Sequence, residues 1–475
     1  MRTIDLLLVA LLVILPLVLL YTTWHLFGTQ WDMAVRYLNG KTLLDFLTHQ
    51  AGFRSAFMGE FLNNRLYYFE PYREPLSTPI FAFLLLLFKN PVLPFILLAY
   101  FGYLFAVYKL AKEMKMDTLA AFSAFTNVYA VYYLFVPNGG EALAITFVLL
   151  GLVCLLRKSP LSGLLFGIAG LAKYPALIAF PMVLLLRERK KILQAVTLEI
   201  ATVVAWAAFD YAAYGVPFYS YIESAYSAVV LPGTSAISAL AAAEVAVYPA
   251  IFAAVCLAFF RFRKARIKIK KGHLQMLASF AALALVGYLL ILPHNDLATQ
   301  ARYGFLFSTA LLLPAALLLS DAFKRSQAIK YGVALAAIVA LASTVCAAYY
   351  FAASPKASYY NYDNANSIYA HAYGVLSGLG LGGCRFVTNA WVPMVYAGYD
   401  AYSPFVIYDS QNATLAPLEG YGARYVGEQK RYPILLFNYT GVSRSFVLDL
   451  NGSRVAYQEQ DLTVYLPQNI NCYRD

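Results

Sequence analysis

Long runs of apolar residues, separated by short basic segments, are the feature that most constrains how this chain folds. A bilayer core about 30 Å thick requires about 20 apolar residues for each helical crossing, and the sequence supplies many such runs. Of its 475 residues, 61% are hydrophobic and only 13% are charged. Because soluble domains carry about 25% charged residues, this composition indicates that lipid is the main solvent of the chain.

The basic residues are concentrated in every second loop between the apolar runs. These basic clusters are Lys109–Lys115, Arg157–Lys158, Arg187–Lys191, Arg261–Lys271 and Lys324–Lys330. The distribution follows the positive-inside rule, so these loops are predicted to face the cytosol and to contact anionic lipid head groups. Membrane topology therefore accounts for the net charge of +11, and no nucleic-acid partner is expected.

Hydropathy and the basic loops together predict a mainly α, polytopic bundle of about eleven transmembrane helices. The expected spans are 6–27, 91–110, 118–136, 141–156, 160–172, 176–186, 193–212, 241–260, 275–293, 303–321 and 331–351. The first span lacks a small-residue cleavage site and is predicted to be retained rather than removed as a signal peptide. An additional apolar stretch, 79–88, reaches only about 15 Å and is expected to be interfacial or half-inserted. An odd number of crossings places the N-terminus in the cytosol and the C-terminus outside.

Residues 353–475 differ in composition from the membrane core, residues 1–352. Tyr, Asn and Gly become frequent, and short runs alternate with turn residues, as in a small extracytoplasmic domain that is β-rich or mixed α/β. The runs expected to form strands are 385–392, 434–437 and 462–466. Three N-glycosylation sequons, at Asn412, Asn438 and Asn451, occur here and nowhere else in the chain, which supports an outside location. Cys384 and Cys472 are the only cysteines of this segment, and an oxidising compartment would allow a disulfide between them.

Ionisable residues within the membrane, or at its outer surface, are energetically unfavourable and usually mark functional sites. Several segments of this chain contain them. In the first outer loop, 28–78, Asp32 follows the first helix. Its carboxylate could take a proton from an acceptor hydroxyl, and the alternative is a helix cap paired with Arg36. Arg73 and Glu74 follow an aromatic-rich stretch of the same loop, a composition that fits a sugar site and an interfacial aromatic belt equally well.

Two further segments lie deeper in the chain. In Pro137-Asn-Gly-Gly-Glu141, an outward turn, Glu141 could bind substrate or simply stabilise the start of a helix. Basic clusters pin both ends of residues 159–186 to the cytosol, and these 28 residues make two arms of about 14, or roughly 21 Å each. Lys173, at the turn between the arms, is therefore expected to face a cavity in the outer half of the membrane. Its partner there would be a lipid-borne phosphate or a buried carboxylate.

A weaker candidate is the outer loop that ends in Arg302 and Tyr303. Arg302 begins a helix that heads inward, and its guanidinium could contact a lipid phosphate through two hydrogen bonds. No Cys/His pattern in the chain indicates a zinc site.

Together these segments resemble the GT-C superfamily of membrane glycosyltransferases, which take sugars from polyprenyl-phosphate donors. The resemblance covers about residues 1–350. It rests on the order of four features: the loop containing Asp32, Glu-Pro-Leu-Ser-Thr-Pro (74–79), Asn-Gly-Gly-Glu (138–141) and Gly-Leu-Ala-Lys-Tyr-Pro (170–175). The last is similar to the lysine–tyrosine–proline turn of mannosyltransferases that use polyprenyl-phosphate mannose. Two features depart from the family: Asp32 is a single acid where many relatives carry two, and the Trp-Trp-Asp motif of oligosaccharyltransferases is absent.

The resemblance implies the inverting transfer of a single sugar, with mannose expected, from a polyprenyl-phosphate donor. The acceptor would be a lipid-linked glycan or a protein at the outer face of the cell membrane. Asp32 would be the general base, and Lys173 and Arg302 would hold the departing lipid phosphate. The other candidate substrate-binding residues are Glu141, Arg73, Glu74, Tyr174 and Tyr303. The resemblance implies no required cofactor and leaves a divalent metal open without indicating one, and the core with its sequon-bearing tail resembles archaeal proteins.

Two other classes of protein remain open at this stage. A transporter or lipid flippase is expected to show paired, repeat-related broken helices, whereas the sequence predicts one broken pair, at Lys173, and no second copy. A non-catalytic scaffold or receptor would act through its tail.

Overall fold

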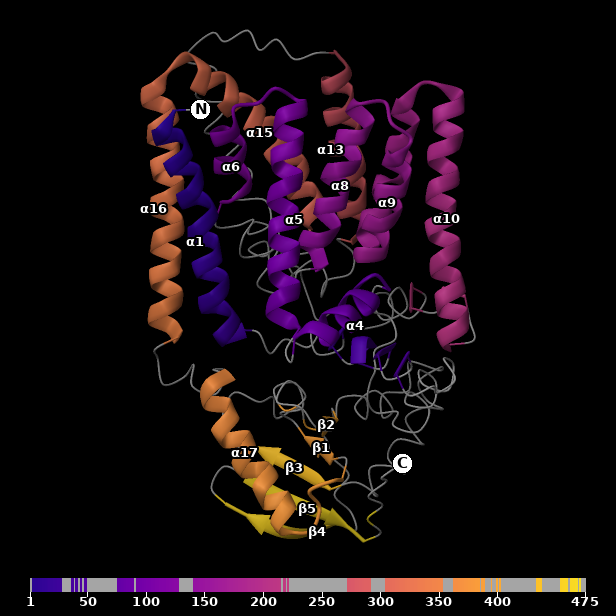
Figure 1. Cartoon of the computed structure of the whole chain (residues 1–475), viewed down its shortest axis with the longest axis vertical. Helices are drawn as coiled ribbons and strands as arrows, with labels where there is room; N and C mark the ends of the chain where they lie inside the picture. Colours follow the sequence, from indigo (N-terminus) through magenta and orange to yellow (C-terminus); the bar gives the residue numbers. More distant parts are fainter. Residues whose placement is uncertain are drawn as a thin grey trace.

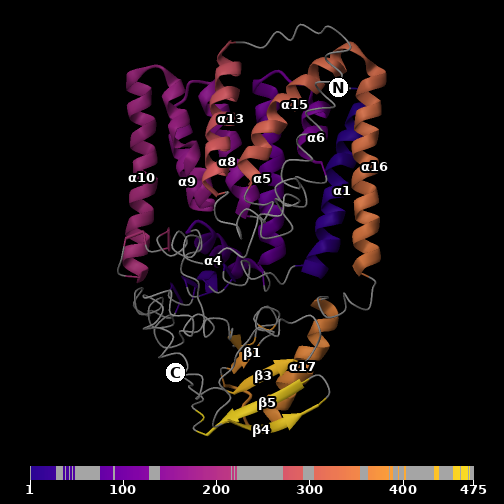
Figure 2. The same cartoon turned by 180° about the vertical axis from the view of Figure 1, so that it is seen from behind.

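The computed structural model of the chain is a bundle of helices with a small sheet beyond one end (Figure 1). The same arrangement is seen from behind in Figure 2. The residues that the structure describes are 2–27, 36–37, 39–41, 43–44, 47–48, 75–88, 91–127, 140–214, 217–218, 220–221, 271–291, 304–352, 362–384, 386–388, 394, 399, 401–402, 433–437, 453–459, 462–468 and 470.

Among the described residues, six helices are long and apolar enough to cross a membrane. They are α1 (Thr3–Phe27), α5 (Val92–Glu113), α10 (Arg189–Tyr214), α13 (Lys271–Ile291), α15 (Phe305–Arg325) and α16 (Gln327–Ala352). Shorter helices are α4 (Ser77–Leu87), α6 (Thr118–Phe125), α8 (Gly140–Leu156), α9 (Leu161–Ala172) and the 3₁₀ helix η1 (Tyr174–Leu186). The predicted mainly helical, membrane-type core is therefore confirmed, while the expected span 241–260 lies outside the described residues.

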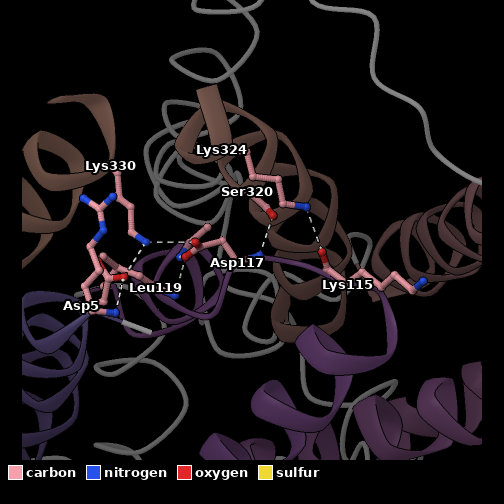
Figure 3. A network of polar contacts seen from close by, with 9 residues as sticks. Asp5, Lys115, Asp117, Leu119, Ser320, Lys324 and Lys330 are labelled. Atoms are coloured by element: carbon pink, nitrogen blue, oxygen red, sulfur yellow. Dashed lines mark hydrogen bonds and ion pairs between the residues drawn. The ribbon is translucent and has the colours of Figure 1, made fainter. Parts of the chain in front are cut away.

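The end of the bundle that carries the N-terminus is held together by a polar network (Figure 3). The Nζ of Lys330, at the start of α16, lies 3.0 Å from the Oδ2 of Asp5 on α1 and 3.1 Å from the Oδ2 of Asp117. Asp117 also caps α6, because its side chain accepts hydrogen bonds from the backbone N–H groups of Leu119 and Ala120. Lys324 of α15 donates to the carbonyl oxygen of Lys115 at 3.1 Å. These contacts join three parts of the chain that are distant in sequence: α1, the turn between α5 and α6, and the consecutive helices α15 and α16.

Two more turns lie at the same end. Arg157, in the turn between α8 and α9, pairs with Glu113 at the end of α5 at 2.7 Å. Arg187, in the turn between η1 and α10, donates a hydrogen bond to Gln275 near the start of α13. The described basic turns are thus gathered at the end of the bundle where the chain begins (Figure 1).

At the opposite end, α4 lies across the bundle instead of along it (Figure 1). Its eleven residues are too few to cross a bilayer, as the sequence predicts for residues 79–88. The helix begins at Ser77, so Pro79 falls in the first turn, where its missing N–H removes no helical hydrogen bond. Gly40, from the segment between α1 and α4, packs against α4: a Cβ at Gly40 would collide with Phe81 and lie 2.9 Å from the backbone nitrogen of Ala82.

Beyond this end lie α17 (Tyr362–Gly378) and a five-stranded sheet. The strands are β1 (Phe386–Thr388), β2 (Ala401–Tyr402), β3 (Ile434–Phe437), β4 (Ser453–Gln458) and β5 (Leu462–Pro467), in the order β2-β1-β3-β5-β4. The first three strands pair in parallel, and β5 pairs antiparallel with both β3 and β4. A sheet with an accompanying helix agrees with the mixed α/β form of the expected tail domain. The sequence did not indicate α17 or β4.

Candidate functional site

A break between α9 and η1 is the feature from which the candidate site is built. Lys173 is the one residue between the two helices, with an extended backbone (φ −160°, ψ 117°). Pro175 explains the break, because a proline ring clashes with the carbonyl four residues earlier and its nitrogen cannot donate to it. That carbonyl belongs to Leu171. The two short arms that the sequence predicts around Lys173 are confirmed by these helix bounds.

The Leu171 carbonyl does not lack a partner. It accepts a hydrogen bond of 3.2 Å from the backbone N–H of Leu76, the residue that precedes α4. The backbone of the Glu-Pro-Leu-Ser-Thr-Pro segment is thereby attached to the backbone of the Gly-Leu-Ala-Lys-Tyr-Pro segment. Ser77 and Thr78 are buried beside this contact. Two of the segments singled out in the sequence therefore meet at the helix break.

A third segment meets them through an ion pair. The Lys173 Nζ lies 3.6 Å from the Glu141 Oε1, and the two side chains are 3% and 0% exposed. Glu141 stands in the first turn of α8, about 22 Å along that helix from the basic turn at its other end. Neither of its carboxylate oxygens accepts a hydrogen bond from any described residue. The pair is therefore electrostatic, and Glu141 has unused capacity to accept hydrogen bonds.

The buried carboxylate was the alternative partner expected for Lys173, and it is the one present. A buried charge pair gains stability only when further hydrogen bonds satisfy its remaining atoms, because the loss of hydration is expensive. Here the separation exceeds hydrogen-bonding distance and the carboxylate oxygens are unfilled. Such a pair is a poor structural stabiliser, but it presents a cation and an acceptor side by side.

Small residues on α9 bring this arm against α10. A Cβ at Gly163 would lie 2.6 Å from the carbonyl carbon of Ala195, and one at Gly167 would lie 2.9 Å from the Cβ of Thr202. Close approach through small residues four apart is a common way for helices to pack in membranes. It fixes α9, and with it Lys173, relative to α10.

Tyr174, the residue after Lys173, contacts a different helix. Lys173 pairs with Glu141 of α8, whereas Tyr174, the first residue of η1, reaches Trp206 of α10. The Tyr174 ring stacks on Trp206 with centroids 5.3 Å apart and an interplanar angle of 22°. Tyr221 lies nearly perpendicular to both rings, with its centroid 5.6 Å from that of Tyr174 and 5.7 Å from that of Trp206. Phe218 meets Trp206 edge-on at 5.2 Å.

A buried carboxylate completes this aromatic cluster. Asp210 stands one helical turn after Trp206 on α10 and is fully buried. Its Oδ2 accepts hydrogen bonds from Ser220, at 3.0 Å from the backbone nitrogen and 2.6 Å from the hydroxyl. The Ser220 hydroxyl in turn accepts a 3.0 Å hydrogen bond from the Trp206 indole. Oδ1 of Asp210 has no hydrogen-bond partner among the described residues.

Several of the predicted site residues lie outside the described residues. They are Asp32, Arg73, Glu74, Arg302, Tyr303, Cys472, Asn412, Asn438 and Asn451. Arg36, from the loop of Asp32, is described and fully buried. Cys384 is disulfide-bonded, and its pairing with Cys472 stays a prediction.

Sequence reasoning missed Asp210, Trp206 and Ser220. Asp210 could have been found, because an ionisable residue within an apolar helix is a functional candidate by the same criterion that selected Lys173. Ser220 could not, because it joins Asp210 only through the turn that follows α10.

Within the described residues, no three His, Cys, Asp or Glu side chains are grouped as a metal site. No protein-family model matches the chain, and no curated protein and no solved structure does.

Proposed function

We propose that this protein is a membrane glycosyltransferase that moves a single sugar, with mannose expected, from a polyprenyl-phosphate donor to a lipid-linked glycan or protein acceptor. The observation that carries the proposal is the buried Lys173–Glu141 pair at the break between α9 and η1. A lysine held at membrane depth can neutralise a lipid phosphate, and the unfilled oxygens of Glu141 can accept hydrogen bonds from sugar hydroxyls.

In this mechanism the acceptor oxygen forms a bond to the anomeric carbon while the bond from that carbon to the phosphate oxygen breaks. The phosphate leaves with the bonding electron pair, and Lys173, with Arg302, stabilises the charge that develops on it. The acceptor hydroxyl loses its proton to Asp32, the general base. Attack from the face opposite the phosphate inverts the configuration of the sugar.

We propose further that the end of the bundle bearing the N-terminus faces the cytosol and that the sheet domain is extracytoplasmic, with eleven crossings in all. Support comes from the basic turns around Lys115, Arg157, Arg187 and Lys324, which all lie at the N-terminal end, since positive residues favour the cytosolic side. In this orientation the helix break opens toward the outer half of the bilayer, where the donor would be bound.

The test is transfer of radiolabelled mannose from dolichyl-phosphate mannose in membranes that contain the full-length protein. Lys173→Met is expected to lower the initial rate by at least about 10²-fold, because it removes the cation that stabilises the leaving phosphate. Lys191→Met is the control: this lysine is one-third exposed, pairs with Glu188 and should leave the rate unchanged. Transfer at the wild-type rate in the Lys173→Met variant would refute the role of this lysine.

A lipid flippase is the second candidate, because a helix broken at one charged residue is also found in transporters. The two functions differ in their products. A flippase moves an intact polyprenyl-phosphate sugar across a sealed vesicle without cleaving it. A transferase releases free polyprenyl phosphate, so thin-layer chromatography of the lipid after incubation distinguishes them.

A further inference from the structure

The cluster on the α10 side of the helix break has a composition that the Lys173–Glu141 pair does not explain. It contains Tyr174, Trp206, Phe218, Tyr221, Asp210 and Ser220. We propose that this cluster is a subsite for a pyranose ring, in which Asp210 accepts a hydrogen bond from a sugar hydroxyl and Tyr221 provides the ring on which the sugar lies. The inference rests on the proposed transferase and identifies where it holds a sugar.

The first observation is the open acceptor on Asp210. Buried carboxylates normally have their oxygens hydrogen-bonded, because an unfilled acceptor at low dielectric is costly. Ser220 donates two hydrogen bonds to Oδ2, whereas Oδ1 accepts none among the described residues although it is buried. Ser220 holds the carboxylate in one orientation, so Oδ1 is a fixed acceptor that no described residue fills.

The second observation is that the aromatic residues of the cluster differ in their exposed fraction. Trp206 and Tyr174 are 4% and 7% exposed and cover each other by stacking. Tyr221, edge-on to both, is 42% exposed. It is therefore the ring of the cluster most available to a ligand, and the buried pair fixes its position. Ligand sites typically combine such an aromatic surface with a few placed polar groups.

The third observation is the position of the cluster. Lys173 and Tyr174 are adjacent in sequence and extend from the break toward different helices. Because the two residues are neighbours at one helix break, a ligand whose phosphate is held by Lys173 would have its next chemical group within reach of the cluster that begins at Tyr174. In a polyprenyl-phosphate sugar that group is the pyranose.

Two other ligand classes fit the cluster less well. A metal ion requires several oxygen ligands, and the cluster supplies one open carboxylate oxygen. A quaternary ammonium binds where aromatic faces enclose a common centre, whereas here Tyr174 stacks on Trp206, and Phe218 and Tyr221 lie nearly perpendicular to Trp206. Hydroxyl donors suit the single acceptor.

The experiment measures binding without turnover. The full-length protein is placed in nanodiscs free of glycoside detergent, and methyl α-D-mannopyranoside binding is followed by saturation-transfer-difference NMR. Asp210→Asn and Tyr221→Leu are each expected to weaken binding by at least about tenfold, because they remove the charged acceptor and the exposed ring. Tyr221→Phe keeps the ring and should retain wild-type binding.

Two matched controls come from the same helix. Glu199 is also a buried acid of α10 with an unfilled oxygen, and it stands three turns away from Asp210. Tyr211 is 61% exposed and adjacent to Asp210 in sequence. Glu199→Gln and Tyr211→Leu should both leave the binding of the mannoside unchanged.

Competition with a short-chain isoprenyl-phosphate mannose shows whether the subsite holds the sugar of the donor or that of the acceptor. Displacement of the methyl mannoside identifies the subsite as that of the donor sugar, and simultaneous binding identifies it as that of the acceptor sugar. Weak ligands typically have dissociation constants of about 1 mM. Absence of mannoside binding at about 50 mM would therefore overturn the inference. So would binding of tetramethylammonium in place of the mannoside, or mannoside binding that is insensitive to both Asp210→Asn and Tyr221→Leu.

The experiments distinguish failure of the proposed sugar subsite from failure of the proposed transferase function. If no variant or condition gives mannosyl transfer but the mannoside binds through Asp210 and Tyr221, the subsite stands and the transferase fails. If transfer depends on Lys173 but is unaffected by Asp210→Asn and Tyr221→Leu, the transferase stands and the subsite fails.

Discussion

The backbone N–H of Leu76 donates a 3.2 Å hydrogen bond to the carbonyl oxygen of Leu171, the carbonyl that Pro175 excludes from the helix ladder. This bond joins the start of α4 to the end of α9. It gives a physical reason for Pro175, two residues after Lys173. Because proline has no N–H, the Leu171 carbonyl lacks its helical hydrogen bond and can accept one from another segment. The helix break therefore positions both a side chain, Lys173, and a neighbouring backbone.

Replacing the proline tests this relationship. Pro175→Ala restores an N–H that can bond to Leu171, so the segment at Leu76 is expected to lose its partner. Donor-dependent transfer should fall by about one to two orders of magnitude, because misplacement of a binding group is costly even when the group is present. Hydrogen–deuterium exchange of residues 75–88 should become faster. Pro181→Ala, within η1, is the matched control and should change neither measurement.

The Lys173–Glu141 pair is expected to show strong coupling in a double-mutant cycle. Lys173→Met alone leaves a buried carboxylate without its cation and should lower the free energy of unfolding by about 3–5 kcal/mol. The double variant Lys173→Met/Glu141→Gln should recover most of that loss, because no isolated charge remains. Midpoints of thermal unfolding in detergent provide the measurement. Additive losses would show that the two side chains do not interact.

Close packing of α9 on α10 can be tested at Gly163. Gly163→Leu places atoms where the Ala195 carbonyl lies, and it should destabilise the protein by about 1–3 kcal/mol through forced separation of the helices. Gly332→Leu, on α16, is the control, since a Cβ there meets no atom within 4 Å. Equal thermal stability of the two variants would contradict the proposed close contact.

The network at the N-terminal end is expected to contribute to stability and not to transfer. Lys330→Met leaves Asp5 buried without its cation and should cost about 3–5 kcal/mol. Lys324→Met removes an exposed hydrogen bond and should change stability by less than about 0.5 kcal/mol. In protein that remains folded, donor affinity should be the same in both variants. Loss of donor affinity in folded Lys330→Met would assign this end a role in binding.

A pH dependence is expected in the sheet domain. Hydrogen bonds donated by Tyr457 and then by His371 hold the pKa of Glu459 below its ordinary value. A carboxyl with a lowered folded-state pKa stabilises the fold above its unfolded pKa, and this contribution is lost as the pH falls through the folded value. Glu459→Gln should therefore speed hydrogen–deuterium exchange of β4 and β5 at pH 7 and make no difference in strong acid. A difference that persists in strong acid would exclude this carboxylate as the cause.

Much of the architecture could be predicted from local patterns. Apolar runs long enough for a bilayer gave the membrane-length helices, and the spacing between Arg157 and Arg187 gave the two short arms around Lys173. The strand at Ile434–Phe437 has the predicted bounds, because an apolar run between turn residues is a local signal. The helix α17 was missed, since its mixture of Tyr, Asn and Ala has weak apolar periodicity.

The sequence by itself determined that Lys173 stands at a turn between two short arms, because the basic clusters leave too few residues for two full crossings. Only the tertiary structure decided which groups lie around the break. Glu141 meets Lys173, Leu76 meets Leu171, and Asp210 with Tyr221 lies near Tyr174 through helix packing and a turn. These pairings join residues distant in the chain, and their geometry depends on close contacts such as Gly163 on Ala195, which no local pattern specifies.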